Sequence, residues 1–196
     1  MKKKEKLSVD IPTIEEIENE QKRLRHRAVY QRTLRGTIAV LLVVAAISVL
    51  VATLWMPVLQ IYGSSMSPTL EAGQIVVSVK TNQLKTGEVV AFWQGNKLLI
   101  KRVIAGPGQW VDIDMDGNVT VDGKELTEDY LDVKALGNCD VELPHQVEES
   151  RWFLMGDNRD VSVDSRSVAI GDVSKDQIEG KIVFRIWPLK EFGSMQ

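Results

Sequence analysis

The feature that most constrains the fold is a long stretch without charge near the N-terminus. Residues 37–70 contain no Asp, Glu, Lys or Arg, and residues 37–56 include only three polar side chains. At about 1.5 Å per residue, a helix over these residues spans roughly 30 Å, the thickness of the hydrocarbon core of a bilayer. Because backbone amides in lipid must pair within their own segment, we predict a transmembrane helix over residues 37–57. Trp55 suits the interface, and Pro57 suits the end of the helix.

Two other interpretations of this stretch are less consistent with it. A buried core helix that is apolar on all sides is rare in a small domain. A cleaved secretory signal has an apolar region of typically about 7–15 residues followed by a small-residue site. The stretch here is longer, begins late and ends in Trp-Met-Pro. We therefore interpret it as a retained anchor.

The charges on either side of the stretch predict its orientation. Residues 1–36 carry ten Lys and Arg against six Asp and Glu, and no acidic residue lies between 21 and 35. After the stretch, no Lys or Arg occurs until Lys80. Because Lys and Arg are enriched on the cytoplasmic side, we predict a single-pass protein of the cell (plasma) membrane. Its segment 1–36 would be cytoplasmic and its domain 58–196 extracytoplasmic.

The N-terminal segment contains a second candidate helix. Residues 14–25 are acidic first and basic later, which suits the helix dipole, and Thr13 and Glu16 have the spacing of a capping box. Few of these residues are apolar, so a core position is excluded. This helix would be solvated or lie on the membrane surface, or else it would bind a partner.

Beyond the stretch, short segments rich in β-branched and aromatic residues predict strands. They cover residues 74–79, 88–93, 98–104, 110–114, 118–121 and 181–187, with Gly, Asn, Asp and Pro between them. No helical periodicity comparable to residues 37–56 follows. We therefore predict a mostly β fold outside the membrane, with antiparallel sheets or a partly closed barrel, preceded by one N-terminal transmembrane helix.

Composition excludes several classes of protein. The formal net charge of −3 argues against a strongly basic nucleic-acid-binding protein, and we expect no nucleic-acid partner. Cys139 is the only cysteine, so an internal disulfide is excluded. His26 and His145 are the only histidines, which excludes a His-rich metal site. We expect neither a metal nor another cofactor.

Two places in the predicted β domain could carry chemistry. Residues 63–70, Gly-Ser-Ser-Met-Ser-Pro-Thr-Leu, are rich in hydroxyls, although a linker loop with capping residues has the same composition. Lys101 shares one face of its predicted strand with Leu99 and Val103. If that face is interior, burial lowers the pKa of the amine by up to roughly 3–5 units, and a neutral Lys can remove a proton from a Ser hydroxyl. The alternative is that Lys101 faces solvent on an edge strand.

A third segment, residues 155–166, is dense in Gly, Asp, Asn, Ser and Arg. Asp164 and Arg166 lie on one face if the chain is extended there, so their side chains can pair. The segment is either a loop held by side-chain hydrogen bonds and ion pairs or an ordinary solvated turn.

Taken together, these segments resemble a known family. The motifs are Ser65-Met-Ser-Pro-Thr69, Gly87-Glu-Val-Val-Ala-Phe92, the strand with Lys101-Arg102-Val103, and the segment from Gly156-Asp-Asn-Arg159 to Asp164-Ser-Arg166. They occur in the order and rough spacing of bacterial type I signal peptidases. The resemblance covers roughly residues 37–188, and four motifs in order are far more specific than any one of them.

The resemblance implies a membrane-anchored serine endopeptidase that removes signal peptides from exported preproteins, with small residues preferred at positions −1 and −3. Its partners would be these signal peptides and the lipid bilayer, without an obligate protein partner. It assigns the nucleophile to Ser65, the general base to Lys101, orientation of the Lys amine to Ser162, a supporting ion pair to Asp164 and Arg166, and a place in the same loop to Asp157.

The oxyanion of such a reaction needs a hydrogen-bond donor, and the backbone N–H of Ser65 is the expected one. Some family members add a hydroxyl two residues before the nucleophile, but this chain has Gly63 there. The turn after the Lys strand also departs from the frequent Gly-x-Pro-Gly-Asp, as Ala105-Gly-Pro-Gly-Gln109. The short insertion that follows suggests a small subdomain around residues 108–150.

Other enzymes and a binding protein fit the sequence less well. A His-based protease would depend on His145, which lies in a predicted loop, and no nucleophile motif of an α/β-hydrolase is present. The acidic residues 112–117 suggest a calcium loop, but the twelfth position is Gly123 rather than Glu. The related autoproteolytic repressors are soluble DNA-binding proteins. An inactive relative acting as a binding module would lack Ser65 or Lys101, and both are present.

Overall fold

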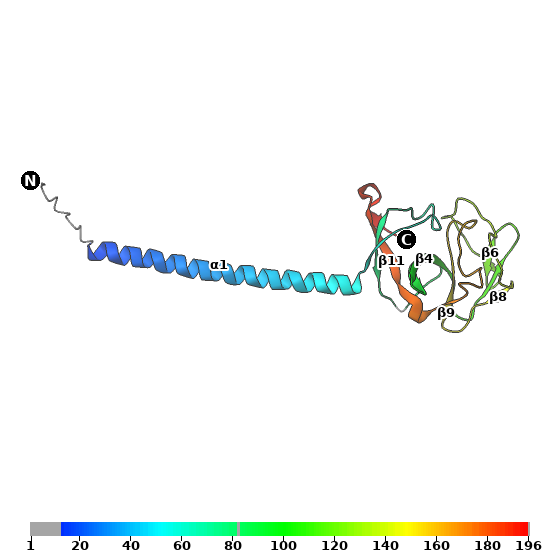
Figure 1. Cartoon of the computed structure of the whole chain (residues 1–196), viewed down its shortest axis with the longest axis horizontal. Coiled ribbons are helices and arrows are strands. Elements are labelled where there is room, and N and C mark those ends of the chain that lie inside the picture. Colours follow the sequence, from blue (N-terminus) through cyan, green and yellow to red (C-terminus); the bar gives the residue numbers. More distant parts are fainter. Residues whose placement is uncertain (1–12, 82, 196) are drawn as a thin grey trace, which may run out of the picture. The chain divides into compact units, whose positions relative to one another are not determined.

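The structure is a computed structural model that describes residues 13–81 and 83–195. The described residues fall into two compact units, which divide between Val51 and Ala52. Figure 1 shows the long N-terminal helix and the β-rich domain that follows it in the chain.

Helix α1 runs from Ile14 to Trp55, so the two helices expected from the sequence are one continuous element. The Thr13 N–H donates to Glu16 Oε2 (2.8 Å) and the Glu16 N–H donates to Thr13 Oγ1 (3.4 Å), which confirms the capping box. None of the residues of α1 is buried. Among the described residues, α1 is the one helix that is long and apolar enough to cross a membrane. It ends two residues before Pro57, whose ring cannot continue a helix.

The β-rich domain contains two antiparallel sheets, and neither of them closes into a barrel. The large sheet has the order β1-β2-β11-β3-β4-β9-β10, with β12 added beside β11. Its strands are β1 (Val58–Gln60), β2 (Ile75–Val79), β3 (Val89–Gln94), β4 (Lys97–Ala105), β9 (Arg151–Met155), β10 (Val173–Ser174), β11 (Ile178–Trp187) and β12 (Gly193–Ser194). The short helices η1 (Lys175–Gln177) and η2 (Leu189–Glu191) precede and follow β11.

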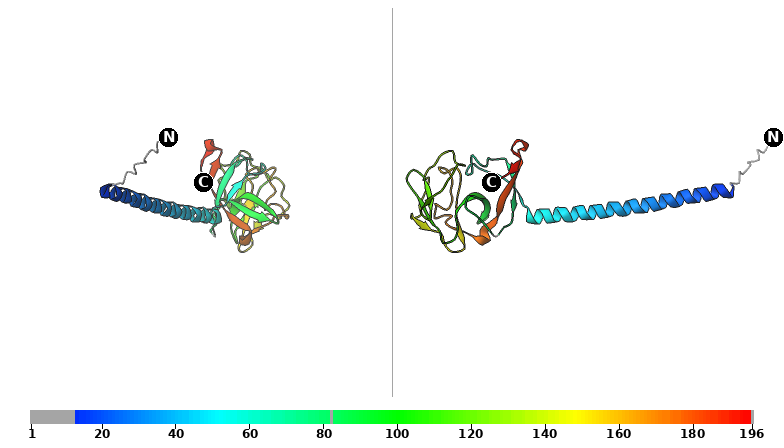
Figure 2. Two further views of the ribbon diagram at one scale, coloured as in Figure 1. Left: turned by 60° about the vertical axis from the view of Figure 1, so that its left-hand side comes forward. Right: turned by 180° about the vertical axis from the view of Figure 1, so that it is seen from behind.

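The small sheet has the order β7-β6-β5-β8. Its strands are β5 (Trp110–Ile113), β6 (Val119–Val121), β7 (Lys124–Glu125) and β8 (His145–Gln146). In Figures 1 and 2 this sheet, with β6 and β8, lies at one end of the β-rich domain and β11 lies at the other. The expectation of a mostly β, antiparallel fold behind one N-terminal helix is confirmed, whereas the division of the chain into segments and a subdomain stays a prediction.

Three apolar clusters hold these layers together and fix the segments around the candidate site. One joins the small sheet to the ends of β4 and β9 through residues such as Val119, Ile104 and Phe153. A second packs the loop after β1, including Met66 and Leu70, against β2, β3 and β11. The third lies on the other side of β3 and β4. Burial of each such side chain stabilises the fold by about 1.5–3 kcal/mol. The clusters therefore hold the strands and loops in place, and with them the polar side chains that lie between the apolar ones.

Candidate active site

Ser65 lies in the loop between β1 and β2, and apolar packing fixes this loop. Its neighbour Met66 is 3% exposed and Leu70 is fully buried. The Leu70 N–H donates to the Met66 carbonyl (2.8 Å), which closes a turn directly after Ser65. The Asn158 N–H donates to the Ser65 carbonyl (3.0 Å) and ties the loop to the segment after β9. The Ser65 N–H has no acceptor among the described residues, so it is free to donate.

Lys101 lies in the middle of β4, opposite Val90 of β3, and only 3% of it is exposed. Its strand neighbour on the same face, Val103, belongs to an apolar cluster. The interior position predicted as one possibility from the alternation of β4 is therefore the one observed, and the solvent-facing edge position is wrong.

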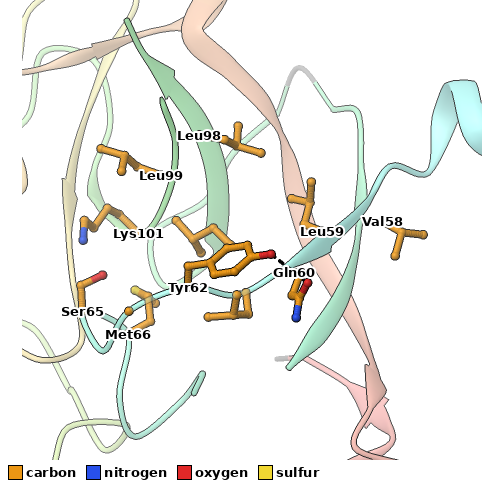
Figure 3. Close-up of a pocket in the computed structure, with 12 residues that line it drawn as sticks. Val58, Leu59, Gln60, Tyr62, Ser65, Met66, Leu98, Leu99 and Lys101 are labelled. Carbon is orange, nitrogen blue, oxygen red and sulfur yellow. Dashed lines mark hydrogen bonds between the residues drawn. The ribbon is translucent and has the colours of Figure 1, made fainter. Parts of the chain in front are cut away.

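A cleft of about 310 Å³ brings Ser65 and Lys101 together. It is lined by two segments, residues 58–63, 65 and 66 after α1 and residues 98–101 of β4. Figure 3 shows the Ser65 hydroxyl and the Lys101 amine at the same end of this cleft, pointing toward one another. No hydrogen bond joins the two groups in the described part of the chain. Catalytic hydrogen bonds are often long until substrate binds.

Burial changes the acid–base character of the amine. Loss of hydration disfavours the ammonium form and is the main reason why the pKa of Lys101 falls from 10.5 to about 8. The carboxylates of Asp164 and Asp157 oppose this effect, and the guanidinium of Arg166 adds to it. A Lys amine with this pKa is deprotonated in an appreciable fraction of molecules near neutral pH, which a general base requires.

Ser162 is buried beside the cleft, and its hydroxyl oxygen has no hydrogen-bond partner of standard geometry. It nevertheless lies close enough to Asp164 to help lower the pKa of that carboxyl. Gly156 makes this close packing possible, since a β-carbon there would lie 2.2 Å from Ser162 Oγ and 2.5 Å from the Ser65 carbonyl oxygen. The Gly156 N–H donates to Asp164 Oδ2 (2.9 Å), which fixes the same turn.

Two buried ion pairs lie near Lys101. Asp164 and Arg166 are joined by two hydrogen bonds of 2.9 Å, from Nε to Oδ1 and from Nη2 to Oδ2. Burial raises the pKa of the Asp164 carboxyl, but hydrogen bonds and charge from Arg166 outweigh it and hold that pKa below its usual value. Arg102, next to Lys101 in β4, donates to Asp157 from Nε (2.9 Å) and Nη2 (2.6 Å). The segment 155–166 is thus a loop held by ion pairs and not a solvated turn.

A third buried pair was missed by the sequence reasoning. Arg159 and Glu128 form an ion pair whose side chains are both fully buried. Arg159 belongs to a motif segment, and that could have singled it out. Glu128 and its neighbour Tyr130 follow β7 in a stretch without a local signal, so only the folded chain brings them to the site.

The arrangement can perform nucleophilic chemistry. It combines a hydroxyl, a buried amine with a lowered pKa and a free backbone N–H at one end of an elongated cleft. Among the described residues, no group of three or more His, Cys, Asp or Glu side chains is placed to hold a metal ion. The observed geometry therefore has the parts needed for acyl transfer by a serine without a histidine.

Comparisons with known proteins place the chain among related sequences. The family model described as "Signal peptidase, peptidase S26" matches residues 34–187. Signal peptidase IB of Staphylococcus aureus (strain COL) is 38% identical over 153 residues, which cover 67% of this chain and 78% of the relative. Signal peptidase I of Bacillus licheniformis is 32% identical over 169 residues, which cover 78% of this chain and 88% of the relative.

A solved structure is also similar. The crystal structure of a signal peptidase I from Enterococcus faecalis V583 is 25% identical, with a TM-score of 0.43. The match covers 52% of this chain and 98% of the other.

Proposed function

The chain belongs to the signal peptidase family, peptidase S26, and is a signal peptidase hydrolase; we propose that it removes signal peptides from exported preproteins with Ser65 as the nucleophile and Lys101 as the general base. The observation that carries this assignment is the almost complete burial of Lys101 at the end of the cleft, where its amine points to the Ser65 hydroxyl.

In the first half of the reaction, the neutral Lys101 amine takes the proton of the Ser65 hydroxyl as Oγ attacks the scissile carbonyl carbon. The carbonyl oxygen becomes an oxyanion, and the free Ser65 N–H donates a hydrogen bond to it. The Lys101 ammonium then gives its proton to the departing amine of the mature protein. The signal peptide stays attached to Ser65 as an ester.

In the second half, Lys101 takes a proton from a water molecule that attacks the ester. The ammonium returns the proton to Ser65 Oγ as the bond breaks, and the signal peptide leaves with a new carboxylate. We assign Ser162 to orienting the Lys101 amine, since its buried hydroxyl has no partner of standard geometry and lies in the loop beside the site.

The walls of the cleft suit an extended peptide. β1 pairs only with β2, and residues 97–101 of β4 pair only with β3 among the described strands. Both walls therefore carry unpaired backbone groups that can add a substrate strand. The apolar lining from Leu59, Leu98 and Ile100 accepts small aliphatic side chains, consistent with a preference for small residues at positions −1 and −3.

We also assign the membrane and its sidedness. The apolar half of α1 would anchor the chain in the plasma membrane, with the basic residues before it in the cytoplasm and the β-rich domain outside. Only nine residues separate Trp55 from Ser65. At no more than about 3.6 Å per residue, this connection keeps the nucleophile within about 36 Å of the helix end, close to where a membrane-held precursor leaves the bilayer.

The test is cleavage of a purified preprotein by the full-length chain in detergent. We expect Ser65→Ala and Lys101→Met to abolish processing while circular dichroism and the melting temperature stay close to wild type. Lys97→Ala is the matched control, because Lys97 is an exposed Lys of the same strand. Wild-type processing by the Lys101→Met variant would contradict the assignment.

A further inference from the structure

We propose that Tyr130 is a positioning residue for this reaction, because it holds in place Arg102, the residue next to Lys101 in β4. The proposal rests on the function proposed above and extends it to a residue outside the four sequence motifs. Tyr130 lies in the chain that follows the small sheet, five residues after the end of β7.

Hydrogen bonds fix the plane of the Arg102 guanidinium. Besides its two bonds to Asp157, Nη1 donates to the Gly87 carbonyl (2.7 Å) and Nη2 donates to Thr69 Oγ1 (3.2 Å). Thr69 belongs to the Ser65 loop, so the same side chain joins β4, the Ser65 loop and the segment after β9. These contacts leave the two faces of the guanidinium to be covered by other groups.

The ring of Tyr130 covers one of these faces. Arg102 Cζ lies 3.8 Å from the centre of the ring, a distance at which a buried cation is attracted to the aromatic face. With the ring in place, Arg102 is only 2% exposed, so water does not reach this face of the guanidinium. The ring therefore fixes Arg102 in the direction that the in-plane hydrogen bonds leave free.

The hydroxyl of Tyr130 links this position to the loop on the other side of the site. It donates to Glu128 Oε1 (2.8 Å), and Glu128 is paired with Arg159. Burial, with added contributions from Glu128, raises the pKa of Tyr130, so the hydroxyl keeps the proton it donates. Arg159 in turn donates from Nε to the Gly156 carbonyl (3.1 Å).

The same network reaches the second ion pair. Arg166 Nη2 donates to the Arg159 carbonyl (2.9 Å), and Arg166 is the partner of Asp164. Tyr130 thus connects the guanidinium of Arg102 to the loop that carries Ser162.

The charges around Lys101 explain why this connection matters for catalysis. Two carboxylates act on the amine, Asp164 and Asp157, and both favour its protonated form. Arg166 opposes the effect of Asp164 on the amine, and Arg102 is the hydrogen-bonded counter-charge of Asp157. If Arg102 loses the ring and moves away from Asp157, that carboxylate acts on Lys101 without compensation. Lys101 then keeps its proton to higher pH, and fewer molecules have a neutral base.

The experiment compares full-length wild type, Tyr130→Phe and Tyr130→Leu by the pH dependence of kcat/KM on a precursor. We expect Tyr130→Leu to move the acidic limb upward by about half to one pH unit and to lower kcat/KM about three- to tenfold below that limb. Tyr130→Phe keeps the ring and should recover most of the shift. Val119→Ala, a cavity in the small sheet away from this network, controls for general loss of stability and should leave the limb in place.

A second measurement does not depend on turnover. Labelling of Lys101 by a small amine-selective reagent, followed by mass spectrometry across a pH series, reports the fraction of neutral amine. We expect the midpoint of labelling to rise in Tyr130→Leu and to stay near wild type in Tyr130→Phe. If the labelling midpoint rises in Tyr130→Leu but the wild-type protein does not cleave the precursor, the role of Tyr130 is supported and the proposed function is refuted. An unchanged midpoint and an unchanged acidic limb in Tyr130→Leu would overturn the role of Tyr130.

Discussion

Arg102 and Asp157 lie 55 residues apart in the sequence and meet in a two-point ion pair, from Nε to Oδ1 at 2.9 Å and from Nη2 to Oδ2 at 2.6 Å. Both side chains are almost completely buried, at 3% and 0% exposed. Arg102 follows Lys101 in β4 and Asp157 follows Gly156 after β9. The pair therefore fastens the strand that carries the amine to the loop that packs against the Ser65 backbone.

Removing the charge of Asp157 should be costly. Asp157→Asn leaves a buried guanidinium without its counter-charge, and breaking a buried pair in this way costs about 3–5 kcal/mol. We expect a loss of that size in the free energy of unfolding, measured by denaturant titration of the full chain. Glu148→Gln is the matched control, since it breaks an exposed pair with Arg151 and should cost about 0–1 kcal/mol. Equal losses of unfolding free energy in the two variants would show that the buried pair stabilises the fold no more than the exposed pair.

Gly156→Ala should disturb both sides of the candidate site, although it adds only one carbon. The added β-carbon would lie 2.2 Å from Ser162 Oγ and 2.5 Å from the Ser65 carbonyl oxygen, so both sides of the site must move apart. We expect a lower kcat and a loss of about 1–3 kcal/mol in stability. Steady-state kinetics and denaturant titration measure the two effects. Gly193→Ala serves as the control because open space surrounds that position, and a Gly156→Ala enzyme as active as this control would contradict the prediction.

Much of the fold could be predicted from the sequence because its signals are local. The apolar run that gives α1, the β-branched segments of β2 to β6 and the turn residues between them each report on their own neighbourhood. The short edge strand β1 was not predicted, since three residues after Pro57 give no alternation to count. Strand β9 was also missed, although its residues are almost all buried.

The candidate site was predictable only as far as its motifs extend. Ser65, Lys101 and Ser162 lie in segments whose residue types stand out, and the resemblance supplied their roles. Glu128 and Tyr130 give no such signal, because their importance comes from partners 31 residues away and from the guanidinium of Arg102 in another layer. Long-range pairing of charges is decided by the folded topology and not by the local pattern.

The pH dependence of cleavage should follow the protonation of Lys101. The pKa of this amine lies at about 8, below its ordinary value, mainly because of burial. The ammonium form cannot accept the proton of Ser65, so kcat/KM should rise through pH 8 and fall about tenfold per pH unit below it. A pH–rate profile tests this, with kcat/KM determined at each pH from precursor concentrations below and above KM.

The acidic limb of this profile is the fall in kcat/KM below pH 8. Its cause can be tested by making the surroundings of Lys101 more polar. Val103→Thr adds a hydroxyl on the same face of β4, which should ease the loss of hydration and move the acidic limb to higher pH. Val111→Thr places the same hydroxyl in the small sheet, away from the amine, and should leave the limb unchanged. If both variants keep the wild-type limb, burial does not set the pKa of Lys101.

Helix α1 should contribute to cleavage only when the precursor is held in a membrane. Deleting residues 1–56 removes α1 but keeps Pro57, whose carbonyl accepts hydrogen bonds from the Ser78 N–H (2.9 Å) and hydroxyl (3.3 Å) and so holds β1 in the sheet. The β-rich domain keeps its clusters and its cleft, so we expect the shortened enzyme to cleave a soluble signal-peptide analogue with a kcat/KM within about threefold of the full chain.

A precursor embedded in vesicles is different, because an anchored enzyme meets it at a high effective concentration in the same membrane. There we expect a loss of about ten- to a hundredfold, measured at equal enzyme concentration. Replacing residues 37–56 by an unrelated apolar helix of the same length should restore processing, since the anchor acts by confinement. Equal processing of the embedded precursor by the shortened and full-length enzymes would show that α1 does not contribute to catalysis in membranes.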